Sequence, residues 1–257
     1  MARKMKDSGI EWIGEIPETW TWIPLKRVFE SRDGGAWGTE PQDNELDRVC
    51  IRVADFNFDQ LIVKESEDYT VRNYDSTTIN KLLLQKGDIL VEKSGGGDLT
   101  PVGRVIGFDL PINALYANFI ERLRTNSLVR PKYLLYLLAL YYYVGVSKKY
   151  IKQTTGIQNL DLSSFLTEYI SIPSLSEQQA IADYLDHKCS LIDSIIEKQK
   201  AVIEKLKLYK QSIITKAVTK GLDPSVKMKP SDIEWIGDIA EGWEVTPLTK
   251  QLDSIID

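Results

Sequence analysis

One long uninterrupted segment constrains the fold of this chain more than any other feature. Residues 176–221 contain neither proline nor glycine before the last position, and both ends carry helix-boundary signals. Ser176 followed by Gln179 is a capping-box pattern, and Gly221 stands where helices often end in a left-handed residue. The sequence therefore predicts a single helix of about 65 Å, which is longer than a compact domain needs for its own core.

Apolar residues recur along this segment in two rows, each with a seven-residue period. This pattern is typical of a helix that packs along another helix as a coiled coil. The remaining face is rich in lysine, which suits solvent, the reading we favour, but also an acidic partner or a phosphate backbone. We expect the coiled-coil seam to be formed by Leu185, Ile192, Ile196, Ile203, Leu206 and Ile213.

The composition is that of an ordinary globular protein. The 257-residue chain is 43% hydrophobic and 27% charged, and its net charge of −5 argues mildly against nucleic-acid binding over the whole surface. No leader opens the chain and no apolar run is long enough to span a membrane, so we expect a soluble cytoplasmic protein. Cys50 and Cys189 have only His187 as a further candidate ligand, which indicates neither a metal site nor a disulfide.

The beginning of the chain is repeated near its end. Residues 5–27, MKDSGIEWIGEIPETWTWIPLKR, reappear without a gap at residues 228–250 as MKPSDIEWIGDIAEGWEVTPLTK. An internal repeat of this kind indicates a repeated structural unit. We therefore expect three parts: a domain at residues 1–174, the long helix at residues 175–221, and the start of a second unit at residues 222–257.

The first part has the pattern of a mixed α+β domain. One strong helix is predicted to begin at Pro131, with a broad apolar face that extends to Tyr141. Tyr141 and the two tyrosines that follow it could stack on bases, although tyrosines on a buried helix are usually core residues. Short strands are predicted near residues 49–53, 60–63, 88–93, 102–108 and 169–172.

Three polar loops of this domain are candidates for binding nucleic acid. The first, residues 31–39, places Trp37 between glycines. The second, residues 92–104, has glycines whose backbone N–H groups can approach a phosphate that flanking cations neutralise. The third, residues 147–159, combines lysines for phosphates with amides and hydroxyls for base edges. The candidates from the last two loops are Lys93, Ser94, Gly95, Gly96, Arg104, Lys148, Lys149, Lys152, Gln153, Thr154, Thr155, Gln158 and Asn159.

Other functions remain open at this point. Each candidate residue, taken alone, also fits an ordinary polar loop. A nuclease site is poorly represented, because Asp88, Glu92 and Lys93 lack the usual spacing, and the Pro-Pro dipeptide of adenine methyltransferases is absent. A structural coiled-coil adaptor would explain the long helix but would leave the polar loops without a role.

Three motifs together resemble the specificity subunits of type I restriction-modification systems. They are the junction TTGIQNLDLSSFLTEYISIPSLSEQQAIADYLD, the KGDILVEKSGGG loop and the repeated IEWIG openings. The resemblance implies an α+β target-recognition domain of mixed short strands that reads one half of a bipartite site in double-stranded DNA, followed by one long coiled-coil-forming spacer helix. It also implies a non-catalytic chain without a cofactor of its own, to which methyltransferase subunits carrying S-adenosylmethionine and a motor-nuclease subunit would be joined.

The family pattern includes a second recognition domain and a second helix, which this sequence lacks. We therefore expect two copies to pair antiparallel through the seam, which would rebuild a two-domain reader of an interrupted palindrome. The competing explanation is a chain shortened by a frameshift, a recombination event or trimming, in which residues 228–250 are a remnant.

Overall fold

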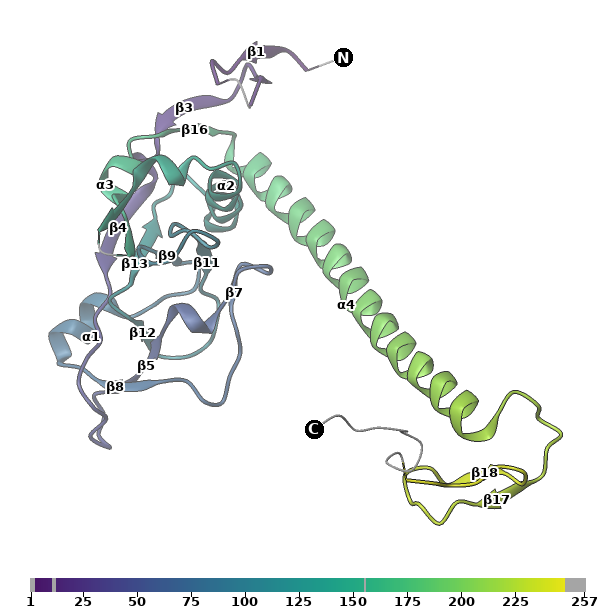
Figure 1. Ribbon diagram of the computed structural model, residues 1–257. Coiled ribbons are helices and arrows are strands. Elements are labelled where there is room, and N and C mark those ends of the chain that lie inside the picture. Colours follow the sequence, from purple (N-terminus) through teal and green to yellow (C-terminus); the bar gives the residue numbers. More distant parts are fainter. Residues whose placement is uncertain (1–2, 11–12, 155, 248–257) are drawn as a thin grey trace. The chain divides into compact units, whose positions relative to one another are not determined.

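The protein forms two compact units, residues 1–189 and 190–257, in a computed structural model that describes residues 3–10, 13–154 and 156–247 (Figure 1). The helices are α1 (Ser76–Leu82), α2 (Pro131–Tyr143), α3 (Leu162–Phe165) and α4 (Leu175–Lys220), with 3-10 turns η1 (Leu25–Val28), η2 (Val53–Asp55) and η3 (Ser147–Tyr150). This is the predicted class, a mixed α+β fold with several short strands and one long helix. The predicted boundaries at residues 174 and 221 stay predictions.

The largest sheet has six strands of mixed direction and is buried on both faces. Its neighbours are antiparallel except for one parallel pair, β11 with β7. Successive side chains of a strand point to opposite faces, so Ile89 and Val91 enter one core and Leu90 enters another. The strand order is β4 (Phe29–Gly34), β13 (Ile120–Thr125), β9 (Ile89–Glu92), β11 (Val105–Gly107), β7 (Ile62–Val63) and β6 (Phe56–Asn57).

Each face of this sheet packs against a different layer. On one face, Leu134 and Leu138 of α2 join the core, and each large apolar side chain buried in this way contributes about 1.5–3 kcal/mol. On the other face, Leu82 of α1 and the fully buried Tyr116 belong to the second core. That second layer is a three-stranded sheet in the order β12 (Ala114–Tyr116), β5 (Asp47–Ile51) and β8 (Val71–Asn73).

The helix predicted from Pro131 is confirmed as α2, and its three consecutive tyrosines lie in different environments. Tyr141 is buried, and its hydroxyl donates to the carbonyl of Tyr169 at 2.7 Å. Tyr143, in contrast, is 70% exposed. The core interpretation therefore holds for Tyr141. The bond fastens α2 to β16 (Tyr169–Ile172), which pairs antiparallel with β3 (Thr21–Pro24).

A buried amide helps to hold the junction between the domain and the long helix. Gln178, in the first turn of α4, is completely buried. Its Oε1 accepts from the backbone N–H of Arg130 at 2.7 Å, and its Nε2 donates to the carbonyls of Leu128 and Pro173 at 3.2 and 3.0 Å. Because a buried amide is costly when unpaired, these bonds fix how the helix leaves the domain.

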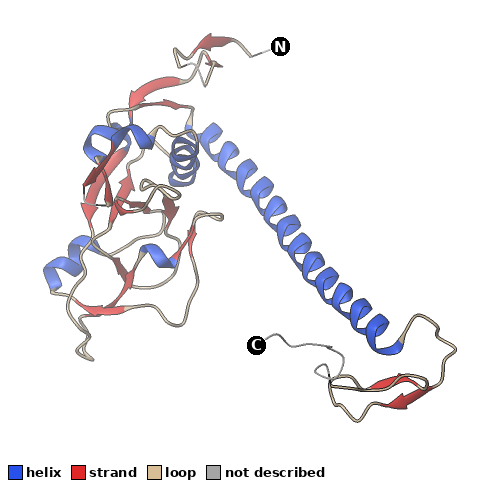
Figure 2. Cartoon of the chain, viewed as in Figure 1, coloured by secondary structure: helices blue, strands red, loops and turns tan. Residues whose placement is uncertain are grey.

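The long helix predicted at residues 176–221 is confirmed as α4, which has 46 residues and no break (Figure 2). The predicted cap at Ser176 was wrong, because the helix begins at Leu175 and Ser174 Oγ accepts from the Glu177 N–H at 3.3 Å. Gly221 follows α4 with a φ of +77°, the left-handed conformation predicted for the helix end. Within the described part of the chain, no helix is both long enough and apolar enough to cross a membrane.

The sequence repeat is also a structural repeat. In the first unit, β1 (Met5–Asp7) pairs with β2 (Glu15–Pro17), and in the second unit β17 (Met228–Pro230) pairs with β18 (Asp238–Ala240) in the same register. The turn bonds correspond as well: Ser8 N–H donates to the Gly14 carbonyl at 2.9 Å, and Ser231 N–H to that of Gly237 at 3.0 Å. The same short hairpin therefore forms in two separate places.

Candidate nucleic-acid interface

The glycine-rich and lysine-rich candidate segments form one three-stranded sheet. β10 (Ser94–Gly95) pairs with β15 (Ile157–Leu160), which pairs with β14 (Ile151–Thr154). Ser94 lies opposite Asn159, and its hydroxyl donates to Asn159 Oδ1 at 2.7 Å. The expectation of a loop at residues 147–159 was wrong, since η3 and a β-hairpin occupy this segment. The structure brings together two candidates that are far apart in the sequence.

The glycine loop that follows β10 has a fixed conformation at its base. Gly96 has a φ of +59°, and a Cβ atom there would lie 2.8 Å from the backbone nitrogen of Val102. That same N–H donates to Gln158 Oε1 at 3.2 Å. The Gln158 side chain is therefore buried within the interface and holds the loop, and its predicted base contact stays a prediction. At Gly97, by contrast, a Cβ atom would meet only open space.

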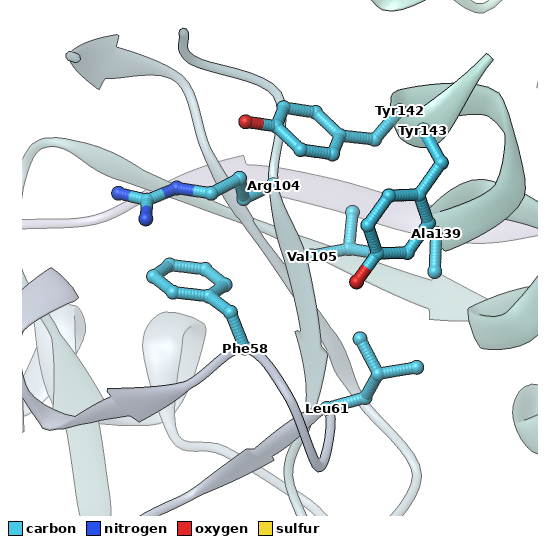
Figure 3. A pocket seen from close by; sticks show the side chains of 7 residues that line it. All are labelled: Phe58, Leu61, Arg104, Val105, Ala139, Tyr142 and Tyr143. Carbon is cyan, nitrogen blue, oxygen red and sulfur yellow. The ribbon is translucent and has the colours of Figure 1, made fainter. Parts of the chain in front are cut away.

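Arg104 is largely buried, with 20% of its side chain exposed. Its guanidinium donates to both carboxylate oxygens of Glu92, at 2.8 and 3.2 Å, and lies 3.7 Å from the centre of the Phe58 ring. In Figure 3 its side chain extends between the rings of Phe58 and Tyr142, beside a cavity of about 30 Å³. A space of this size suits a water molecule. The prediction that Arg104 neutralises a phosphate conflicts with this placement, because its charge is already paired.

The lysines of the hairpin segment project into solvent. Lys152 Nζ lies 2.7 Å from Asp161 Oδ2, and this bond, together with bonds from Ser164, lowers the pKa of Asp161 to about 2. Lys149 Nζ lies 3.8 Å from Glu168 Oε1. Lys148 is exposed, and its ammonium group has no hydrogen-bond or ion-pair partner among the described residues. Exposed ion pairs are weak, so all three ammonium groups remain available to an anion.

Two exposed polar side chains lie on opposite faces of the hairpin. Asn159 on β15 lies opposite Lys152, whereas Gln153 on β14 lies opposite the buried Gln158. The predicted contact at Thr155 lies outside the described residues, as does the side chain of Thr154. One face of the hairpin therefore presents the Asn159 amide beside the Lys152 ammonium, which is the combination that serves base edges and phosphates.

Lys93 connects β9 of the large sheet to β10, which precedes the glycine loop. Its Nζ lies 3.6 Å from Glu121 Oε2, and its side chain is 27% exposed. The backbone N–H of Lys93 and that of Ser94 both donate to the carbonyl of Phe119, whose ring is 49% exposed. Phe119 was missed in the sequence, because its type and neighbours do not distinguish an exposed phenylalanine from a buried one.

Trp37 lies apart from this sheet. Its ring is 42% exposed, and the guanidinium of Arg72 lies 4.9 Å from the ring centre. No hydrogen bond or ring contact between described residues joins Trp37 to β10, β15 or β14. The expectation of a loop at residues 31–39 was partly wrong, since residues 31–34 belong to β4. The loop begins at Gly35, where a Cβ atom would lie 2.2 Å from the Ala117 carbonyl.

The carboxylates weighed above as a nuclease site are bound to arginines. Glu92 pairs with Arg104, and Asp88 accepts from Arg124 at 2.8 and 2.7 Å. Over the described ranges, no three His, Cys, Asp or Glu side chains are grouped so as to hold a metal ion. The chemistry offered by the surface is hydrogen bonding and cationic attraction, which suits noncovalent binding of a polyanion.

These features define a class of protein: a mixed α+β binding module that continues into a long helix with exposed apolar residues. Comparisons with known proteins give the family. Residues 17–205 match the model for the type I restriction modification DNA specificity domain, and the chain belongs to that family.

Individual relatives agree with this assignment. A Methanocaldococcus jannaschii protein, provisionally named the type I restriction enzyme MjaX specificity subunit, is 30% identical over 241 residues, covering 93% of this chain and 54% of that protein. The type I restriction enzyme StySPI specificity subunit of Salmonella potsdam is 24% identical over 231 residues, covering 86% and 47%. The chain spans about half the length of the curated relatives it matches.

Two solved structures share the fold. One is a chain from a structural study of complex assembly in a type I R-M system, with a TM-score of 0.61, 20% identity, and coverage of 85% of this chain and 49% of that chain. The other is the HsdS subunit from Thermoanaerobacter tengcongensis, with a TM-score of 0.50, 20% identity, and coverage of 85% and 48%.

Proposed function

We propose that this chain recognises a short sequence in double-stranded DNA, as the non-catalytic specificity component of a type I restriction-modification complex. The observation that carries the proposal is the sheet of β10, β15 and β14, which presents Lys152 and Asn159 on one face and Gln153 on the other, next to Lys148 of η3, on the domain of a family member. The lysines would bind phosphates whatever the sequence, and the amides would pair with base edges in the major groove.

We also propose that the domain reads one half of a bipartite site and that a second copy of the chain supplies the other half. The support lies on α4, where Ile192, Ile196, Ile203, Leu206 and Ile213 are between 45% and 59% exposed. Apolar residues at coiled-coil spacing gain stability when a second helix covers them. An antiparallel pair would place two domains at opposite ends of a shared spacer, with twofold symmetry.

The remaining components would come from partners in the cytoplasm. Methyltransferase subunits would bring S-adenosylmethionine and the adenine chemistry, and the restriction and translocation subunit would join through the complex. The names of the relatives support this context, because each is a specificity subunit of a type I restriction enzyme. In this arrangement the chain needs no cofactor of its own.

A selection experiment tests DNA reading without any partner. The full chain is incubated with a pool of duplexes whose central 30 or so base pairs are randomised, and the bound duplexes are sequenced after several rounds; a window of that length spans about three helical turns of DNA. Enrichment of a short motif is expected. Recovery of the pool without enrichment, or failure to retain duplexes at low salt, would contradict the proposal and favour a structural adaptor.

A further inference from the structure

An apolar side chain stands in solvent at the tip of the glycine loop. Leu99 is 97% exposed, more than any other large apolar side chain among the described residues. It lies between Asp98 and Thr100, which are also exposed. Single exposed leucines are common on protein surfaces, so the exposure of Leu99 becomes informative only through the way the loop is held.

The base of this loop is fixed although its tip is exposed. Gly97 N–H donates to the carbonyl of Thr100 at 3.1 Å, which closes the tip around two residues, Asp98 and Leu99. Below the tip, Val102 is fully buried and is bonded to Gln158, and β10 pairs with β15. A tip held in this way loses little conformational freedom when it binds, so even a small contact contributes to affinity.

The chemistry of the two tip residues selects one kind of surface on DNA. In the described part of the chain the Asp98 carboxylate has no hydrogen-bond or ion-pair partner, and it would be repelled by phosphates and by the negative potential of the minor groove. In the major groove, the cytosine N4 amine donates a hydrogen bond that a carboxylate can accept. Thymine presents its C5 methyl group in the same groove, where apolar side chains make contact.

We propose that Asp98 and Leu99 form a reading tip for pyrimidines in the major groove. Asp98 accepts a hydrogen bond from cytosine N4, and Leu99 packs on the C5 methyl group of a neighbouring thymine. This inference rests on the proposed function and adds two specificity-determining residues to it.

Base selection by variants tests the role of Asp98. The randomised-duplex selection is repeated with the full-length Asp98→Asn and Leu99→Ala chains, and with Leu222→Ala as a control, because Leu222 is 90% exposed in the other unit. Since asparagine pairs with adenine, Asp98→Asn is expected to change one position of the motif from cytosine to adenine, while the other positions stay as in the wild type. An unchanged motif in both tip variants would overturn the proposal.

Removing a single methyl group from the DNA tests Leu99. Each thymine of the selected duplex is replaced in turn by deoxyuridine, and affinity is measured by fluorescence anisotropy. One replacement is expected to weaken wild-type binding about fourfold, the effect of exposing one methyl group, and to leave Leu99→Ala binding unchanged. Equal sensitivity of both proteins at every thymine would overturn the role of Leu99. If the wild type selects no motif, the proposed function itself fails, which is a different result.

Discussion

At the scale of single residues, two adjacent glycines of the glycine loop differ in whether a larger side chain would fit. Gly96 combines a φ of +59° with a Cβ position 2.8 Å from the Val102 nitrogen, whereas Gly97 borders open space. Gly96→Ala is therefore expected to lower the free energy of unfolding by about 1–3 kcal/mol through backbone strain. Gly97→Ala should stay within about 0.5 kcal/mol of the wild type. Urea denaturation measures both changes. Equal losses of unfolding free energy would contradict a fixed conformation at the base of the loop.

Two basic residues predicted as DNA contacts are expected to behave differently. Arg104→Ala leaves the buried Glu92 carboxylate without its partner, so we expect the free energy of unfolding to fall by about 3 kcal/mol. Lys148→Ala removes an exposed charge, so stability should be unchanged while the slope of log affinity against log salt flattens by about 1. Fluorescence anisotropy titrations of one duplex at several salt concentrations measure the slope, and urea denaturation measures the stability. A flattened slope with full stability for Arg104→Ala would contradict the assignment.

At the scale of elements, Gln178 makes the buried part of the attachment of α4 to the domain, beside more exposed bonds such as that from Trp20 Nε1 to Glu177 at 3.1 Å. Gln178 is fully buried and makes three hydrogen bonds to backbone groups, whereas the exposed Gln179 bonds only to Asp183 on the same helix. Gln178→Ala should lower the free energy of unfolding by about 1–3 kcal/mol, because buried backbone groups lose their partner. Gln179→Ala is the matched control and should have little effect. Similar values for both variants would count against Gln178 as the fastening residue.

The rest of α4 carries the proposed pairing surface. Ile203 lies on the seam, and Ala201 lies on the opposite face of the same turn of the helix. Ile203→Asp would place an unpaired carboxylate in the paired seam, so we expect light scattering to give the mass of one chain for this variant. Twice that mass is expected for the wild type and for Ala201→Asp at micromolar concentration. A wild-type monomer under these conditions would contradict the pairing.

At the scale of the whole molecule, the sequence predicts the locally determined elements well. The periodicity of α4, the proline at the start of α2 and the β-branched residues of β16 are local signals, and each element lies where it was expected. The pairing of β10 with β15 is not local, because Ser94 and Asn159 are 65 positions apart. Nor does a polar residue type reveal burial, which is why Gln158 and Arg104 were grouped with surface residues.

The errors in the predicted loops have the same physical origin. Residues 31–34, 151–154 and 157–159 are polar enough to resemble loops, yet neighbouring strands complete their hydrogen bonds. Strand propensity depends on such neighbours more than on the segment itself. The arrangement of the candidate interface is therefore a tertiary property, and the role of its residues in binding DNA stays a prediction.

The central claim is that this chain determines which DNA sequence is recognised. The most direct measurement is to combine it with a cognate methyltransferase subunit and S-adenosylmethionine and to map every modified adenine on a mixed DNA substrate. We predict modification at one split motif of constant spacing whose two halves are related by twofold symmetry, and none when either protein is omitted. Adenines modified without regard to sequence, or modified by this chain alone, would contradict the account.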